Sequence, residues 1–499
     1  MERVGLSENS VCKLGSLLDQ QNGNLLSEIG LSEGDVMDGV GIFGEGCSYS
    51  IGLIAPQLVE NGYTYVILDF GSHYRNVLYN FKNAHILRLG TDFSLNPLYG
   101  EGMESTEYTD LFVTAFSQTY GLSAKEERIL FEALINAVES VEDGMLTLNG
   151  FDTTLREFDE STNATELRNV EEIIRFMKPL FYYEGKNKPF SSQQSMPISK
   201  LFSDLTIIEL EKFSSHRFRA FIQALMVLKY LAYLRKTRNK HTPIKSTIVM
   251  IDSAEHLLQT RFNLPVDQRK PRFIYYLDEL KEKNATFHVC SKFPSEIDPL
   301  VFGLLGTKIF HRTLDVRDWK TVQAQLTLNE NQRNLFFELK SGQALMKTKW
   351  SQIAVPLIIN RPNWLFLPPL LDSQIEEALM RRGFPLEQIR EEREMRISKK
   401  MLERDFESNA VIAYDVLKTL KDYSNVTKTA LIQFLTQYTK DMVLQVLREL
   451  ERRGYATTRF VKKPHKMWIL SLEEVGEKAL VEWERSGQSR FTKNDKGGE

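Results

Sequence analysis

The sequence predicts an α/β protein: a doubly wound, mainly parallel sheet with a helical insertion, followed by a C-terminal winged helix-turn-helix domain. Three observations support this fold class. Short apolar segments that favour strands alternate with amphipathic segments that favour helices. A glycine-containing loop separates the first of these strands from a helix and a second strand. The strand segments are GVGIF, YTYVILDF, HILRLG, DLTIIELEKF, KSTIVMID and ATFHVCSKF, with GTKIFHRTL and a hairpin strand, QALMKTKW, after them.

The chain is long enough for several domains, and changes in composition suggest where they meet. Residues 104–200 are more polar and mainly helical, residues 362–371 are rich in proline, and residues 385–405 are densely charged. We expect an N-terminal segment at 1–37, an α/β core at 38–103 and 201–370, a helical insertion at 104–200, a charged helical linker at 371–405, a winged helix-turn-helix at 406–485 and a disordered tail at 486–499.

Composition excludes several classes of protein. Lysine and arginine number 63 against 66 aspartates and glutamates, so any nucleic-acid surface must be local. Cys12, Cys47 and Cys290 are far apart in sequence and form no metal-ligand pattern, which favours a reducing cytoplasm over a disulfide scaffold. The N-terminus lacks the apolar core of a signal peptide. The longest apolar segment, at 220–234, is too short and too polar to span a bilayer.

Residues 41–48, GIFGEGCS, nearly match the phosphate-binding pattern G-x-x-x-x-G-K-[ST]. Gly41, Gly46 and Ser48 fit, but Cys47 stands where the pattern has lysine. A lone match of this kind is a common accident, and the helix and the Asp-ended strand that follow favour descent from a nucleotide loop. Backbone N–H groups at a helix N-terminus suit phosphate. The expected nucleotide-binding residues are Gly41, Gly44, Gly46, Cys47, Ser48 and Tyr49.

Two further positions should meet this loop, because nucleotide sites in such folds lie beyond the carboxyl ends of the strands. Asp252 ends TIVMID and, with Ser48, could hold Mg²⁺ directly or through water. Lys292 leaves the strand ATFHVCSK, and its flexible stem could bring an ammonium group to the β- and γ-phosphates in place of the missing lysine. His73, His85 and His288 have no ligand spacing and are expected to be structural.

These segments, in this order, resemble the HerA branch of the FtsK–HerA superfamily, whose members are hexameric P-loop ATPases that translocate DNA. The resemblance covers roughly residues 38–360 and implies ATP and Mg²⁺ as cofactors. It also implies that Arg312, with Arg317 as a competitor, lies near the neighbouring subunit's site. It is carried by GIFGEGCS, VILDFGSHYRNVL, FSLNPL, DLTIIEL, VMIDSAEHLL, CSKFPSEI and GTKIFHRTLDVRDW.

The departures from the family pattern concern catalysis. Cys47 replaces the phosphate lysine, Ser253 replaces the general base expected after Asp252, and Lys292 replaces a glutamine. Glu255 is a weaker candidate base, since a helix start would point it elsewhere. Loss of a general base costs about 10²–10⁴ in rate. We therefore expect impaired or absent ATP hydrolysis, with Asp252, Lys292 and Arg312 as the residues that any remaining catalysis would use.

Three functions stay open at this stage. The first is a ring-forming, DNA-associated component, either a homo-oligomer (a hexamer by resemblance) or a hetero-oligomer with an active ATPase. The second is an active DNA translocase that uses Lys292. The third is a non-enzymatic DNA-binding regulator or scaffold. The stretch at 1–37 is too short for the β-barrel that precedes the core in typical HerA proteins, which puts that family's nuclease partnership in doubt.

The tail predicts DNA contact. Three helical segments precede ATTRFVKKPHKMWILS, which favours a two-stranded wing. Thr427 and Thr439 are expected N-caps. Winged helices also mediate protein contacts, and basic residues are often only solvated. The expected DNA-binding residues are Lys440, Arg448, Arg452, Arg453, Lys462, Lys463 and Lys466.

Overall fold

The computed structural model describes residues 10–381 and 406–480, with gaps inside these ranges. The chain divides into two compact units, 1–384 and 385–499, and each is described by itself. The predicted tail at 486–499 and most of the predicted linker lie outside the described residues. The internal gaps are 20–23, 141–145, 147, 149–150, 152–153, 156–166, 182–189, 191–195, 238–245, 261–271, 329, 407–408, 424–425, 454, 462–466, 474–475 and 478–479.

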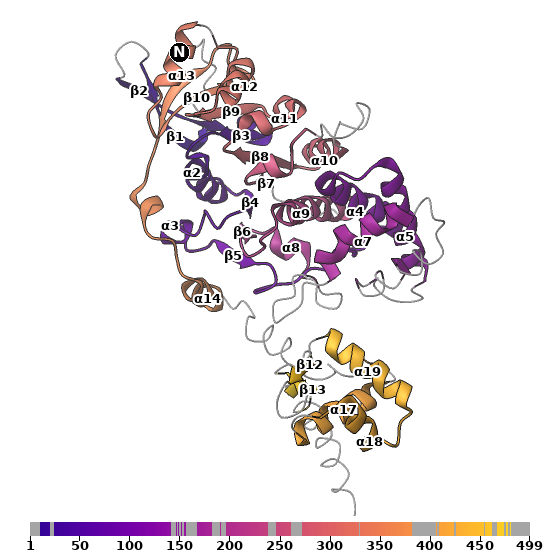
Figure 1. The fold of residues 1–499 in the computed structure, drawn as a ribbon. Helices are drawn as coiled ribbons and strands as arrows, with labels where there is room; N and C mark the ends of the chain where they lie inside the picture. The colour runs from indigo at the N-terminus through magenta and orange to yellow at the C-terminus, as the bar shows by residue number, and fades with distance from the viewer. Residues whose placement is uncertain are drawn as a thin grey trace, which may run out of the picture. The chain divides into compact units, whose positions relative to one another are not determined.

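An 11-stranded sheet forms the centre of the first unit, in the order β2-β1-β11-β10-β9-β3-β8-β7-β4-β6-β5 (Figure 1). The strands from β9 to β5 run parallel, and β10, β11, β1 and β2 continue the sheet with antiparallel pairs. The strands are β1 (Ser10–Leu18), β2 (Leu25–Ser32), β3 (Val40–Phe43), β4 (Thr64–Asp69), β5 (His85–Arg88), β6 (Leu205–Glu209), β7 (Thr247–Ile251), β8 (Ala285–Ser291), β9 (Thr307–His311), β10 (Gln343–Thr348) and β11 (Val355–Ile359).

The parallel strands are apolar because helices cover both faces of the sheet. Every residue of β4, β7 and β8 is buried, which is typical of central parallel strands. α2 lies on one side of these strands, and α9 and α10 lie on the other (Figure 1). The helices of this unit are α1 (Glu33–Met37), α2 (Cys47–Glu60), α3 (Val77–Asn80), α4 (Ser105–Tyr120), α5 (Ala124–Glu139), α7 (Leu167–Phe181), α8 (Ile198–Leu201), α9 (His216–Thr237), α10 (Arg272–Lys281), α11 (Pro299–Leu304), α12 (Val316–Leu326), α13 (Glu330–Glu338) and α14 (Asp372–Met380), with short 3₁₀ turns η2 (Ala254–His256), η4 (Pro294–Glu296) and η5 (Asn363–Phe366).

The described part of the segment at 1–37 belongs to the sheet rather than standing apart from it. β1 pairs with β11, with Gly15 opposite Ile359, and β2 pairs with β1. α1 then begins at a capping box in which the Ser32 hydroxyl accepts from the backbone N–H of Asp35. The strand β3 follows directly, so this segment leads straight into the glycine loop.

Helices of the predicted insertion pack onto the core helix α9. α4 packs against α5 and α9, and the rings of Phe112, Phe116 and Phe221 lie within 6.1 Å of one another. Lys229 on α9 is fully buried and donates to the carbonyl oxygens of Asn96 and Tyr99. Burial lowers the pKa of Lys229 to about 8. The apolar rings therefore hold the insertion against α9, and the buried Lys229 holds the core segment at 96–99 that precedes it.

The described residues of the second unit form three helices and a two-stranded antiparallel sheet: α17 (Ala410–Asp422), α18 (Lys428–Phe434), α19 (Lys440–Arg452), β12 (Ala456–Val461) and β13 (Met467–Leu472). The hydroxyl of Thr427 accepts from Ala430 N–H, and that of Thr439 accepts from Met442 N–H, so both expected N-caps are present. Val416, Leu431 and Leu447 lie in its apolar core. The assignment as a winged helix-turn-helix stays a prediction.

Among the residues that the structure describes, no helix has the length and apolar character needed to cross a membrane.

Candidate nucleotide site

The carboxyl edge of the sheet gathers the residues that the sequence singled out. The order β3-β8-β7-β4 makes neighbours of the glycine loop after β3, Lys292 after β8, Asp252 after β7 and Asp69 at the end of β4. Parallel strands end at the same edge, which is where α/β proteins place their ligands. The expectation that the loop, Asp252 and Lys292 share one edge is met.

The glycine loop between β3 and α2 is short and tightly turned. β3 continues through Phe43, whose ring stacks on Phe310 at 4.9 Å, and Gly41 lies within the strand. Gly44 and Gly46 then turn the chain with φ values of 90° and 87°, which glycine adopts without strain. Only a short turn therefore separates the strand from α2.

Two backbone donors of this turn are already engaged. Gly44 N–H donates to the carbonyl of Ser291 at 3.0 Å, and Glu45 N–H donates to the carbonyl of Arg312 at 2.9 Å. A phosphate group would have to replace both of these bonds to use the same donors. A Cβ atom at Gly44 would stand 2.6 Å from the carbonyl oxygen of His311, so the turn is pressed against the end of β9.

Cys47 opens α2 where the phosphate pattern has lysine, and its side chain is buried. Cys47 lies beside Cys290 on β8. The pKa of the Cys290 thiol is raised mainly by burial and further by a hydrogen bond with Cys47. Ser48 is half-buried, and Tyr49 stacks on Phe366 at 5.4 Å. With the turn closed and no ammonium at Cys47, these residues as arranged do not fit a magnesium triphosphate.

Asp252 is held by groups from β4 and the loop after it. Its Oδ1 accepts from the Tyr74 hydroxyl at 2.9 Å, and its Oδ2 accepts from the backbone N–H of Phe70 at 3.1 Å. His73 Nδ1 lies 3.3 Å from the same Oδ2. From α9, Gln223 donates to the backbone carbonyls of Asp252 and Leu68, which ties the ends of β7 and β4 together.

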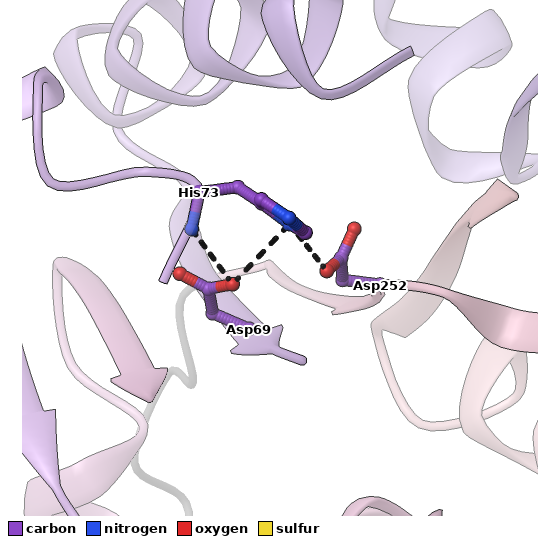
Figure 2. A group of neighbouring side chains, drawn as sticks. All are labelled: Asp69, His73 and Asp252. Atoms are coloured by element: carbon purple, nitrogen blue, oxygen red, sulfur yellow. Dashed lines mark hydrogen bonds and ion pairs between the residues drawn. The ribbon is translucent and has the colours of Figure 1, made fainter. Parts of the chain in front are cut away.

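Asp69 completes a compact group with His73 and Asp252 (Figure 2). Asp69 Oδ1 accepts from the backbone N–H groups of Gly71 and His73, both at 3.1 Å, and lies 3.8 Å from His73 Nδ1. Burial, followed by the charge of Asp252, raises the pKa of Asp69. The hydrogen bond to Asp252 raises the pKa of His73. The ionisation of Asp69 and that of His73 therefore depend on each other.

Glu255 lies in the 3₁₀ turn η2 and is buried instead of pointing away from the site. Ser253 before it adopts a left-handed conformation with φ of 50°, which turns the chain sharply after Asp252. Burial raises the pKa of Glu255 to about 7, while a hydrogen bond to Ser291 opposes this shift. A carboxyl group that titrates near neutral pH suits general acid–base chemistry better than the sequence pattern indicated.

The candidate cations of the site are exposed. Lys292 directly follows β8, and its side chain is exposed. Arg312 follows β9 with an exposed side chain, and Arg317 pairs with Asp315 at 2.9 Å. The roles expected for Lys292 and Arg312 stay predictions.

In the second unit, α19 buries Val443 and Leu447 and leaves Lys440 and Arg448 exposed. Arg452 and Arg453 both pair with Glu449, at 2.6 and 2.5 Å, so part of their charge is neutralised. Of the expected DNA-binding residues, Lys462, Lys463 and Lys466 lie outside the described residues.

Comparison with known proteins gives a fold. No family model matches the chain, and no curated protein sequence matches it. VirB4 of Thermoanaerobacter pseudethanolicus aligns over 73% of this chain and 100% of its own, with 14% identity and a TM-score of 0.53. The bacterial conjugative coupling protein TrwB, in an unbound form named TrwBdeltaN70, aligns over 74% of this chain and 100% of its own, with 10% identity and a TM-score of 0.50. The chain has the P-loop NTPase fold of VirB4 and TrwB. The predicted α/β class with a mainly parallel sheet is confirmed.

The sequence did not single out the partners of Asp252. Asp69, His73 and Tyr74 belong to VILDFGSHY, which was used only to support the family resemblance, and His73 was expected to be structural. The signal available was an aspartate ending one strand and a histidine four residues later. That spacing alone could not show that β4 lies next to β7.

Proposed function

We propose that this chain is a HerA-like, ring-forming and DNA-associated protein of the cytoplasm whose P-loop ATPase fold has lost most or all ATP hydrolysis. One observation carries the proposal: Asp252, at the position expected to hold Mg²⁺, is bonded to Tyr74, Phe70 and His73 on the β4 side. Cys47 and the closed turn support it from the phosphate side. A missing lysine removes about 1.5–3 kcal/mol of binding per charged hydrogen bond.

The fold shared with VirB4 and TrwB supports the assembly part of the proposal. TrwB is described as a conjugative coupling protein. By the family resemblance we infer a hexamer of this chain, or a mixed ring in which a second, active ATPase supplies turnover. The exposed face of α19 with Lys440 and Arg448 supports DNA contact through a winged helix-turn-helix.

A second function, an active DNA translocase, is favoured by the position of Lys292. Lys292 follows β8 at the edge where the phosphate lysine is missing, and burial raises the pKa of the Glu255 carboxyl group to about 7. Bound ATP and Mg²⁺ would supply the phosphoryl chemistry, with Ser48 and Asp252 as the magnesium-side residues. This function requires the turn at Gly44–Gly46 to open first.

A third function is that of a DNA-binding scaffold that does not respond to nucleotide. In that case ATP should have no effect on the protein. Calorimetry with ATP and Mg²⁺ on wild type and Lys292→Ala separates the translocase from the other two functions. We expect weak or absent binding that is equal in the two proteins, with Lys320→Ala, an exposed lysine on α12, as the matched control. Tight binding that disappears only in Lys292→Ala would overturn the proposal in favour of the translocase.

A further inference from the structure

The group formed by Asp69, His73 and Asp252 has the composition and spacing of a metal site. One ligand atom from each residue lies within 4.8 Å of the other two. Asp69 ends β4, His73 lies in the loop that follows, and Asp252 follows the neighbouring strand β7, so the fold itself brings the three together (Figure 2).

The separations suit a single ion. His73 Nδ1 lies 3.3 Å from Asp252 Oδ2 and 3.8 Å from Asp69 Oδ1. Metal bonds of about 2.0–2.2 Å place ligand atoms roughly 2.8–3.1 Å apart at octahedral angles and roughly 3.3–3.6 Å apart at tetrahedral angles. Small side-chain rotations are therefore enough for all three atoms to face one cation.

The balance of charge around the group also points to a cation. The side chains of Asp69 and Asp252 are 0% and 3% exposed, and Glu255 next to them is buried. Glu255 Oε2 has no hydrogen-bond partner among the described residues. Buried carboxylates are ordinarily paired with a cation or a metal, and one imidazole offsets at most one of them.

Neighbouring groups orient the would-be ligands. Backbone N–H groups of Gly71 and His73 donate to Asp69, and the Tyr74 hydroxyl donates to Asp252. Such outer contacts fix ligand geometry in metal sites and leave other lone pairs free for the metal. The His73 side chain is 37% exposed, so the group is reached from solvent past this ring.

We propose that Asp69, His73 and Asp252 bind one divalent first-row transition metal ion, such as Mn²⁺, in the absence of nucleotide. A mixed set of imidazole and carboxylate ligands suits Mn²⁺ or Zn²⁺, whereas Mg²⁺ prefers oxygen ligands alone. This site shares Asp252 with the expected magnesium site of Ser48 and Asp252, but here the carboxylate faces the loop after β4 rather than the glycine loop. Three protein ligands leave coordination positions for water.

The test is Mn²⁺ binding to the full-length, chelator-treated protein without nucleotide, followed by calorimetry and by electron paramagnetic resonance. We expect one Mn²⁺ per chain, at least tenfold weaker binding in Asp69→Asn and His73→Ala, and an imidazole-nitrogen coupling that disappears in His73→Ala. His216→Ala, an exposed histidine on α9, is the matched control and should bind as wild type does.

Three results would overturn the site. These are no Mn²⁺ binding to wild type, binding that both variants retain, and binding that appears only when ATP is added. Circular dichroism melting of each variant checks that it is folded, and Asp69→Asn keeps the shape of the side chain. Since nucleotide is absent, failure here leaves the proposed loss of ATP hydrolysis untouched.

Discussion

The hydroxyl of Tyr74 donates a 2.9 Å hydrogen bond to Asp252 Oδ1, and both side chains are buried. This bond joins the loop after β4 to the end of β7 and fixes the carboxylate that the sequence marks as a magnesium ligand. An aspartate held in this way serves the structure of the sheet edge, and its release would cost the energy of that bond.

Tyr74→Phe tests how firmly Asp252 is held. Removing a donor to a charged, buried acceptor should lower the free energy of unfolding by about 1.5–3 kcal/mol. Urea denaturation measures this change. Tyr79→Phe removes an exposed hydroxyl that donates to the Pro368 carbonyl, and it should cost less than about 0.5 kcal/mol. Equal losses in the two variants would contradict the account.

Glu255 should make stability depend on pH. Its pKa is raised from 4.5 to about 7 in the folded chain, so the folded state holds the proton to higher pH than the unfolded state does. The resulting stabilisation is complete below about pH 4.5 and is lost as pH rises through 7. Glu255→Gln should therefore match wild type near pH 4.

At pH 8 the same variant should be more stable than wild type by roughly 3 kcal/mol, the free energy that corresponds to this pKa change. Urea denaturation of both proteins at several pH values, with a chelator present, provides the measurement. A stability difference that stays constant with pH would show that the pKa of Glu255 is the same in the folded and the unfolded chain.

Arg75 anchors the segment before α14 to the sheet edge. Its guanidinium group forms two 2.6 Å hydrogen bonds with the buried carboxylate of Glu209, and a third bond reaches Asp372. Arg75→Ala leaves Glu209 buried without these donors, which should cost about 3–5 kcal/mol. Asp372→Asn alters an exposed partner and should cost less than about 1 kcal/mol. Thermal and urea unfolding compare them, and a larger loss in Asp372→Asn would refute the anchoring role.

Arg448 should contribute to DNA binding without selecting a sequence. Its side chain is exposed on α19, where a phosphate contact is expected. Arg448→Ala should weaken binding to unrelated duplexes alike and reduce the salt slope by about one. Fluorescence anisotropy at several salt concentrations measures both. Lys421→Ala, an exposed lysine on α17, is the control, and an equal effect there would mean that the charge of the unit, not α19, governs binding.

Local patterns predicted the strands and caps well. TYVILD and TIVMI are apolar throughout and form β4 and β7, and Thr427 and Thr439 cap their helices because a hydroxyl there meets free backbone donors. The site needed information that local patterns do not hold. β4 follows β3 in the chain but lies beside β7, so the meeting of Asp69 with Asp252 depends on strand order.

The glycine loop at 41–48 also shows what local sequence patterns do not predict. Gly41, Gly46 and Ser48 fit the phosphate pattern by spacing, but the pattern says nothing about Phe43 between them. The Phe43 ring packs against Phe310, and the strand continues through this residue. The turn that follows is hydrogen-bonded to the backbone carbonyls of Ser291 and Arg312. The sequence also favoured Glu255 too little as a candidate base. The left-handed backbone of Ser253 turns the chain so that the Glu255 side chain is buried.

ATP turnover by the full-length chain, with Mg²⁺ and with or without DNA, tests the central claim most directly. The account expects no DNA-stimulated turnover, and the same background rate in wild type and Lys292→Ala. DNA-stimulated hydrolysis in wild type that is lost in Lys292→Ala would contradict it. That result would mean that the turn at Gly44–Gly46 opens and that the phosphate lysine has moved to β8.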